Sequence, residues 1–218
     1  IGSQLTETQP FVDALARVIS MIDHLETLGI QLKHIDIGGG LGVTYKDEVP
    51  PTVTEYANSM KPALEKLGLK VYMEPGRSIS ANAGVLVTKV DLLKPTTHRN
   101  FAIVDAAMND LIRPSLYDAW MDIQQVNSNT TVEAKAWDVV GAICETGDFL
   151  GKERMLAIEA NDHLAVMGAG AYGFVMSSNY NSRGRAAEVM VDGDQAHLIR
   201  ARESLESLWE NERLLPAE

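Results

Sequence analysis

A glycine-rich turn that directly follows a short apolar strand constrains this chain more than any other feature. The apolar segment His34–Ile37 ends in Gly38-Gly39-Gly40-Leu41-Gly42. The next apolar segment, Leu69–Met73, ends in Glu74-Pro75-Gly76-Arg77. Two strands that each end in a tight turn and are separated by a helical segment predict a parallel sheet with crossover helices.

Two amphipathic helices are expected beside these strands. Apolar side chains recur at three- and four-residue spacing over 11–25 and again over 56–67, which predicts one buried face on each helix. Thr8 is suited to cap the first helix. Gly29 and Gly68 are suited to end the two helices.

Strands dominate the sequence after about residue 85. The segments expected as strands are Val85–Leu93, Asn100–Ala106, Val132–Ile143, Arg154–Ile158, Glu188–Val191 and Ala196–Ile199. Only 169–179 and 203–209 are expected to be helical in this part, and Asn127–Thr130 is expected to be a polar loop. The fold class is therefore predicted as α/β followed by a mostly β domain of barrel or sandwich type.

The α/β part is too short to form a complete barrel. A (β/α)₈ barrel takes about 250 residues, and unpaired strand edges would remain open in a shorter piece. The chain also begins with Ile1 rather than Met. We therefore expect part of a longer protein, with a partial barrel over 1–84, a β domain with a helix returning to the barrel over 85–192, and a terminal strand and helix over 193–218.

The composition excludes several classes of protein. Thirty acidic and nineteen basic residues give a formal charge of −11, which disfavours nucleic acid as a partner. No apolar stretch has the length of a membrane span. A single cysteine and the lack of a signal peptide favour a cytoplasmic protein. The five histidines stand at no metal-binding spacing, so no metal site is expected.

The two turns after the strands carry the first candidate site. Glycines at 38–40 let the main chain approach an anion closely, although a tight turn without a ligand explains them equally well. Glu74 and Arg77 lie where barrel enzymes hold catalytic groups. An exposed ion pair between the two is the alternative, and it would contribute about 0–1 kcal/mol.

The β part holds the second group of candidates. Arg113 and Tyr117 are suited to hold a substrate carboxylate, or they are a packed arginine and a half-buried tyrosine. Cys144 and Glu145 follow an apolar strand, and the thiol is either functional or an inert core residue. The glycine-rich segment 168–173 is suited to bind an anion.

Taken in order, these motifs resemble the diaminopimelate decarboxylases, which belong to the fold-type III pyridoxal-phosphate decarboxylases with an alanine-racemase-like barrel. The resemblance runs over nearly the whole chain. Its motifs are Ile1-Gly2-Ser3-Gln4, the segments 34–42 and 74–78, Met108-Asn109-Asp110-Leu111-Ile112-Arg113-Pro114-Ser115-Leu116-Tyr117, Cys144-Glu145-Thr146-Gly147-Asp148, Gly170-Ala171-Tyr172-Gly173 and Asn179-Tyr180-Asn181-Ser182-Arg183.

The resemblance implies a role for each matched residue. Glu74 would face the pyridine nitrogen of pyridoxal phosphate, and Cys144 would be the acid that returns a proton to the α-carbon. The residues implied around the cofactor and its phosphate are Ser3, Gly38, Gly39, Gly40, Glu74, Pro75, Gly76, Arg77 and Tyr172. The residues implied to bind substrate are Arg77, Arg113, Tyr117, Glu145 and Tyr172.

The implied reaction is decarboxylation of meso-2,6-diaminopimelate to L-lysine and CO₂, in a homodimer with shared active sites. Gly184 departs from the proline that the family usually has there, which loosens the backbone. The lysine that forms the Schiff base and the histidine that stacks on the cofactor have no match in this sequence. The resemblance therefore implies the C-terminal part of the enzyme, inactive alone.

Other functions remain open on the sequence. A decarboxylase of the same fold for ornithine, arginine or carboxynorspermidine is one, and a non-catalytic homologue that binds partners is another. The latter is disfavoured because binding alone requires neither a thiol acid nor a carboxylate at the ring nitrogen. An alanine racemase is disfavoured because those enzymes place an arginine where Glu74 stands.

Overall fold

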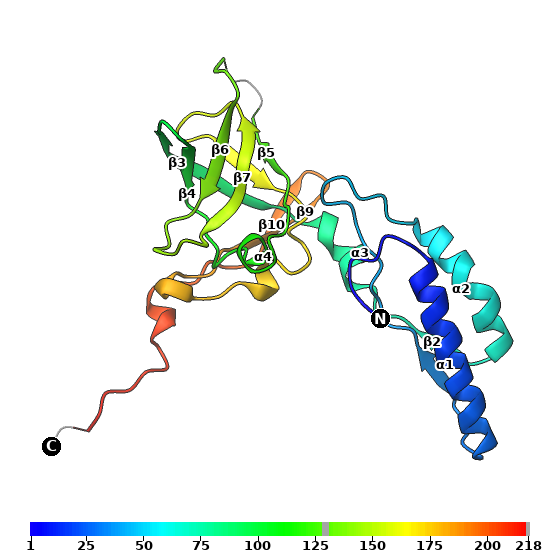
Figure 1. The fold of residues 1–218 in the computed structure, drawn as a ribbon. Coiled ribbons are helices and arrows are strands. Elements are labelled where there is room, and N and C mark those ends of the chain that lie inside the picture. The colour runs from blue at the N-terminus through cyan, green and yellow to red at the C-terminus, as the bar shows by residue number, and fades with distance from the viewer. Residues whose placement is uncertain (128–130, 217–218) are drawn as a thin grey trace. The chain divides into compact units, whose positions relative to one another are not determined.

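The computed structural model describes residues 1–127 and 131–216, and the chain divides into two compact units, Ile1–Gly84 and Val85–Glu218. The elements of the first unit are α1 (Gln9–Thr27), β1 (His34–Asp36), α2 (Val53–Leu67), β2 (Lys70–Tyr72), α3 (Gly76–Ser80) and a 3₁₀ turn (Ala81–Ala83). Strands β1 and β2 pair in parallel. Helices α1 and α2 lie side by side (Figure 1). The expected alternation of helix and strand is confirmed for this unit.

Helices α1 and α2 form because each has one apolar face. Phe11, Leu15 and Ile22 of α1 are buried and share a core with Tyr56 and Met60 of α2. The rings of Phe11 and Tyr56 meet edge to face with centroids 4.8 Å apart, a favoured aromatic geometry. This core fixes the two helices on one side of the strand pair.

Helix α2 begins with a capping box. Thr52 Oγ1 accepts a hydrogen bond from Glu55 N at 3.1 Å, and Glu55 Oε2 accepts one from Thr52 N at 2.7 Å. Two N–H groups that the first turn leaves unpaired are thereby satisfied. Thr8 stands at the N-cap of α1 as expected, but its side chain makes no capping hydrogen bond.

The second unit is built on one mixed sheet. Its elements are β3 (Leu86–Pro95), β4 (Asn100–Val104), α4 (Arg113–Tyr117), β5 (Ile123–Gln125), β6 (Lys135–Val140), β7 (Phe149–Leu156), β8 (His163–Val166), β9 (Glu188–Asp192) and β10 (Gln195–Arg200). Six strands form a sheet in the order β5-β8-β3-β4-β6-β7. The pair β4–β6 is parallel and the other pairs are antiparallel.

This sheet curves until its two edge strands approach each other. The side chain of Gln125, on β5, donates to Ala157 O at 2.5 Å and accepts from Ala157 N at 3.3 Å, just beyond β7. From β7 itself, Arg154 Nη2 donates to Met121 O at 3.0 Å. The unit is therefore barrel-like, with a core of fully buried side chains that include Val90, Leu150 and Leu164.

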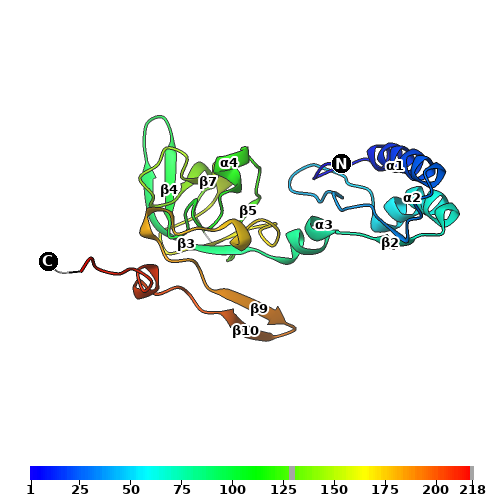
Figure 2. The same cartoon turned by 90° about the horizontal axis from the view of Figure 1, so that it is seen from below.

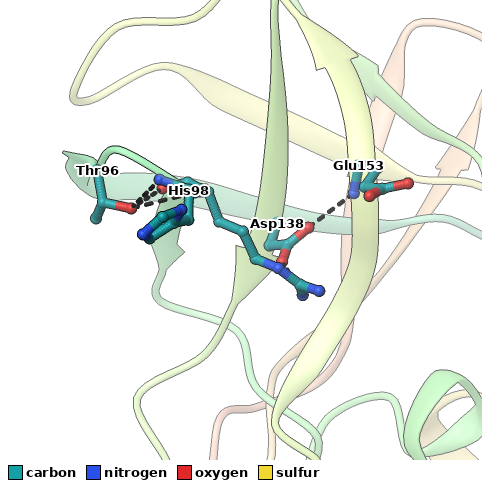
Figure 3. Close-up of polar contacts among 5 residues, drawn as sticks. Thr96, His98, Asp138 and Glu153 are labelled. Carbon is teal, nitrogen blue, oxygen red and sulfur yellow. Dashed lines mark hydrogen bonds and ion pairs between the residues drawn. The ribbon is translucent and has the colours of Figure 1, made fainter.

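A buried carboxylate on β6 joins the β3–β4 turn to β7 (Figure 3). Asp138 is 5% exposed; its Oδ2 lies 3.2 Å from Arg99 Nη1, and its Oδ1 accepts from Glu153 N at 2.8 Å. The pairing of β6 with β7 shifts register between Trp137 and Val139. Asp138 thus satisfies the N–H of Glu153 where the ladder is interrupted.

Strands β9 and β10 form a separate antiparallel hairpin (Figure 2). Every residue of β10 is exposed. Among the residues that the structure describes, no helix has both the length and the apolar character needed to cross a membrane.

Two expected helices are wrong, and two strands were not expected. Over 169–179 the chain forms a turn and a short 3₁₀ helix, Phe174–Met176, because Tyr172 has φ +60° and glycines interrupt the segment. Over 203–209 only a 3₁₀ turn, Glu206–Leu208, is present. The unexpected strands, β5 and β8, are only three and four residues long. Of the expected polar loop 127–130, residues 128–130 lie outside the described part.

Candidate functional site

In the first unit, the carboxyl ends of β1 and β2 are joined by main-chain hydrogen bonds. Glu74 N donates to Gly38 O at 2.8 Å, and Ile37 N donates to Tyr72 O at 3.1 Å. Gly38 N donates to Asp36 Oδ1, also at 2.8 Å. The two turns that the sequence singled out therefore meet at one edge of the strand pair, as expected for parallel strands.

Gly39 is required by close main-chain packing. A Cβ at this position would overlap the carbonyl oxygen of Glu74. The neighbouring Gly40 O accepts from Leu5 N at 3.0 Å, and Leu5 O accepts from Gly42 N at 2.9 Å. The turn thus packs between the segment that carries Ser3 and the segment that carries Glu74. Close packing against the Glu74 carbonyl therefore explains why position 39 is a glycine, whether or not a ligand binds there.

Arg77 is held by two hydroxyl groups. Its Nη2 and Nε donate to Ser3 Oγ at 3.1 and 3.3 Å, and its Nη1 donates to the Tyr45 hydroxyl at 2.6 Å. The guanidinium carbon also lies 5.7 Å from the centroid of the Tyr45 ring. The guanidinium therefore has hydroxyl partners from two other segments of the first unit, the one that carries Ser3 and the one that carries Tyr45.

Tyr45 was missed by the sequence analysis, and a single carboxylate orders its loop. Glu48 Oε2 accepts from Tyr45 N at 3.0 Å and from Lys46 N at 2.7 Å. The hydrogen bond from the main-chain N–H of Lys46 is the main cause that holds the pKa of the Glu48 carboxyl below its usual value. A carboxylate three residues after a tyrosine is too common in sequences to have indicated this loop.

A cavity of about 340 Å³ lies in the first unit beside the strand ends. Gly38, Asp36 and Glu74 line it on the polar side. Its apolar wall includes Phe11, Leu15 and Ile35. A cavity of this volume and mixed lining is in the range of small-molecule sites.

In the second unit, the segment 144–148 forms a closed loop after β6, which we call the thiol loop. Cys144 and Glu145 are exposed, whereas Asp148 is 5% exposed. Asp148 Oδ2 accepts from Ile143 N and its Oδ1 accepts from Met108 N, both at 2.7 Å. The loop that presents the thiol is therefore tied to the loop that precedes α4.

A second contact joins the thiol loop to α4. The hydroxyl of Ser115 donates a short hydrogen bond to Gly147 O. Arg113, on the same helix, is 7% exposed, and its Nη1 lies 3.0 Å from Met121 Sδ. Tyr117, at the end of the helix, is 62% exposed. The structure thus brings α4, which carries two expected substrate-binding residues, against the loop that carries Cys144 and Glu145.

Asn109 and Arg183 join two of the family motifs by a contact that was not expected from the sequence. Asn109 is 1% exposed; its Oδ1 accepts from Arg183 Nε at 2.9 Å, and its main-chain O accepts from Ser178 N at 2.9 Å. Next to it, burial raises the pKa of the Asp110 carboxyl above its usual value. Asn109 belongs to the motif 108–117 and Arg183 to the motif 179–183, so neither motif taken alone predicts the hydrogen bond between them.

Glu145 and Tyr172 complete the candidates of the second unit. Glu145 Oε2 lies 3.5 Å from the Tyr180 hydroxyl, and its Oε1 accepts from Gly147 N at 3.4 Å. Tyr172 lies in the turn 170–173 with a left-handed backbone, and the residue is 39% exposed. The candidates thus form two groups, one in each unit.

The first group lies on the turns of the first unit and consists of Ser3, Gly38, Gly39, Gly40, Glu74, Pro75, Gly76 and Arg77. The second group lies on α4 and on loops of the second unit and consists of Arg113, Tyr117, Cys144, Glu145 and Tyr172. Within the first group, the Gly76 amide donates to Glu74 O at 2.8 Å.

Residues 14–170 match the family described as "Pyridoxal-dependent decarboxylase, C-terminal sheet domain". A diaminopimelate decarboxylase from Pseudomonas fluorescens is 59% identical over 216 residues, which are 99% of this chain and 52% of that protein. One from Vibrio cholerae is 57% identical over 217 residues, again 99% of this chain and 52% of that protein. The chain therefore spans about half the length of the curated relatives it matches.

A comparison with a solved structure also finds similarity to a diaminopimelate decarboxylase. The diaminopimelate decarboxylase from Helicobacter pylori, complexed with L-lysine, is 41% identical and superimposes with a TM-score of 0.90. The match covers 97% of this chain and 52% of that chain. The likeness thus extends over both units.

Proposed function

Because this chain belongs to the pyridoxal-dependent decarboxylases, we propose that it is the C-terminal part of an enzyme that converts meso-2,6-diaminopimelate to L-lysine and CO₂. The observation that carries the proposal is 59% identity over 99% of the chain to a protein named diaminopimelate decarboxylase. The match covers 99% of the chain and therefore spans both units. The lysine held by the Helicobacter pylori relative is the product that the proposed reaction would release.

The first unit is proposed to belong to a (β/α)₈ barrel of the alanine-racemase type. Its parallel strands β1 and β2, with α1 and α2 packed on one side, support this. In such barrels the active site lies at the carboxyl ends of the strands. Ser3, Glu74 and Arg77 lie at that end of β1 and β2.

The residues at these strand ends fit pyridoxal phosphate. A Cβ built on Gly38 or Gly76 would face open space, so a ligand has room to approach the main chain at both turns. Ser3 Oγ and the Arg77 guanidinium lie together, and such donors suit a phosphate. Gly38, Gly39, Gly40, Pro75 and Gly76 supply the surrounding main chain.

When bound, pyridoxal phosphate supplies the electron sink that decarboxylation requires. Glu74 is proposed to keep a proton on the pyridine nitrogen, which strengthens that sink. Arg77 is proposed to bind substrate as well, because its planar guanidinium donates parallel hydrogen bonds to a carboxylate. Tyr172 is proposed to contact both the phosphate and the substrate.

The second unit is proposed to supply the proton and the substrate contacts. The exposed Cys144 thiol returns a proton to the α-carbon after CO₂ leaves, since a positioned thiol can act as a general acid. Glu145 binds the distal ammonium group. Arg113 and Tyr117, on the helix tied to the same loop, bind substrate oxygens.

We propose a homodimer in which the thiol loop of one copy serves the cofactor of the other. The support is the family resemblance, and the exposure of Cys144 and Glu145 on the second unit is compatible with it. Cytoplasmic localisation is proposed on the same basis.

The test is a substrate panel with the purified full-length enzyme and pyridoxal phosphate. CO₂ release and lysine formation are measured with meso-diaminopimelate, ornithine, arginine and carboxynorspermidine. We expect kcat/KM for meso-diaminopimelate to exceed the others by about 10³ or more, since a site built for a polar substrate group strongly rejects analogues that lack it. Preference for another amino acid, or no turnover despite bound cofactor, would refute the proposal.

A further inference from the structure

We propose that Asp148 is a positioning residue that holds the Cys144 thiol in its reactive place. The inference rests on the proposed function, because it takes Cys144 as the proton donor. Asp148 lies four residues after Cys144, and its carboxylate is buried while the thiol is exposed. It acts through the main chain of the loop and does not contact the substrate.

The carboxylate of Asp148 bridges two loops. Its Oδ2 accepts from Ile143 N, the residue just before Cys144, and its Oδ1 accepts from Met108 N, in the loop that leads to α4. Both distances are 2.7 Å, which is short for N–H donors and typical of bonds to a charged acceptor. One side chain therefore closes the thiol loop and anchors it.

The main chain of the loop adds further constraints. Glu145 N donates to Ile143 O at 2.8 Å, and Asp148 N donates to Glu145 O at 3.0 Å. Ser115 ties Gly147 O to α4. Cys144 is thus enclosed between bonded residues on either side, which leaves its main chain little freedom to move.

The space around the carboxylate is fully used. A Cβ on Gly141 would lie 2.6 Å from Asp148 Oδ2 and 2.5 Å from the Cβ of Ala107. The strand that leads into the thiol loop and the loop before α4 are therefore in close contact at Asp148. A side chain of another length would have to separate them.

An asparagine at this position would keep the shape but lose one acceptor. An amide nitrogen cannot accept a hydrogen bond. Either Ile143 N or Met108 N would then face a donor, and a buried donor left without a partner is costly. Asp148→Asn therefore releases one of the two loops while preserving volume.

Asp138, on β6 of the same unit, offers a matched control (Figure 3). It is also 5% exposed, and its carboxylate also accepts from a main-chain N–H, that of Glu153. Its other partner is Arg99, in the turn between β3 and β4. Asp138→Asn thus removes a comparable buried carboxylate from a place that supports the sheet and not the thiol loop.

The experiment is a double-mutant cycle in the full-length enzyme with its cofactor. Steady-state kcat and KM and the melting temperature are measured for Asp148→Asn, Asp138→Asn, Cys144→Ala and the double variant Asp148→Asn/Cys144→Ala. Residues that act as one unit show strongly non-additive effects on kcat. We expect Asp148→Asn to lower kcat by about 10- to 100-fold with KM within about threefold of wild type, and to lower it no further once Cys144 is gone.

Several outcomes would overturn the inference. One is an equal loss of kcat from Asp148→Asn with and without Cys144, and another is an equal loss from Asp138→Asn. If Cys144→Ala itself leaves kcat unchanged, the proposed function fails at the proton donor, and this result is distinct from the other two. Should Asp148→Asn fail to fold, Ser115→Ala removes only the hydroxyl contact with Gly147; we expect several-fold lower kcat, and wild-type kcat would overturn the inference.

Discussion

The glycine-rich turn of the first unit and the thiol loop of the second reach their shapes by different means. In the first, Gly39 packs against the Glu74 carbonyl so closely that no side chain fits. In the second, the buried carboxylate of Asp148 accepts hydrogen bonds from two separate loops. Steric exclusion shapes one region, and a polar side chain shapes the other.

This difference decides how each region tolerates change. Where main-chain atoms pack closely, an added atom lowers the stability of the folded state. Where a side chain anchors a loop by hydrogen bonds, loss of an acceptor displaces the residues that the side chain holds. Variants of the two regions are therefore expected to separate in stability and in turnover.

The largest effect is expected in the thiol loop, from Cys144→Ala in the full-length enzyme. Turnover at saturating meso-diaminopimelate should fall by about 10²–10⁴, because loss of a positioned general acid costs this much. The exposed thiol contributes little packing, so the melting temperature should stay near that of wild type. Normal turnover would make Cys144 an inert residue.

The next effect is expected in the glycine-rich turn, from Gly39→Ala. The added methyl group meets the Glu74 main chain, so we expect the free energy of unfolding to fall by about 2–4 kcal/mol. Gly76→Ala is the control for stability, because open space surrounds a Cβ at that position. Chemical denaturation of both variants checks this, and equal stability would contradict the steric explanation.

A smaller effect is expected from Arg77→Lys. An ammonium group cannot reproduce the parallel hydrogen bonds of a guanidinium. Affinity for the cofactor or the substrate should fall by about 1.5–3 kcal/mol, as for a hydrogen bond to a charged group. Titration of both ligands measures this, and unchanged affinity for both would show that Arg77 serves only the fold.

The smallest effect is expected from Tyr45→Phe, which removes the hydroxyl that accepts from Arg77 Nη1. Water replaces part of the lost hydrogen bond, so KM for the substrate should rise by a factor corresponding to about 0.5–1.5 kcal/mol. Stability should change little because the ring is retained. A KM equal to wild type would mean that the Tyr45 hydroxyl is not needed to orient Arg77.

Sequence periodicity was sufficient for the first unit because its elements follow local rules. Helix α2 begins in a capping box at Thr52 and ends just before Gly68, and both signals lie beside the helix in the sequence. Short strands such as β5 carry too few residues to show alternation. The segment 169–179 was expected to be helical, but the left-handed backbone of Tyr172 interrupts any helix there.

The candidate residues could be identified in the sequence, whereas the groups that hold them could not. Cys144, Glu145 and Arg77 lie in recognisable motifs. Tyr45 approaches Arg77 across 32 positions, and Met108 approaches Asp148 across 40. Such contacts depend on how loops fold back on each other, which neither spacing nor composition records.

The central claim is that the strand-end turns of the first unit and the thiol loop of the second serve one reaction across two copies of the chain. Its most direct test mixes full-length Glu74→Ala and Cys144→Ala chains, each expected to be inactive alone. A mixed dimer would hold one site with both residues intact, so part of the wild-type activity should return. No return of activity, with exchange of subunits verified by mass spectrometry, would contradict the claim.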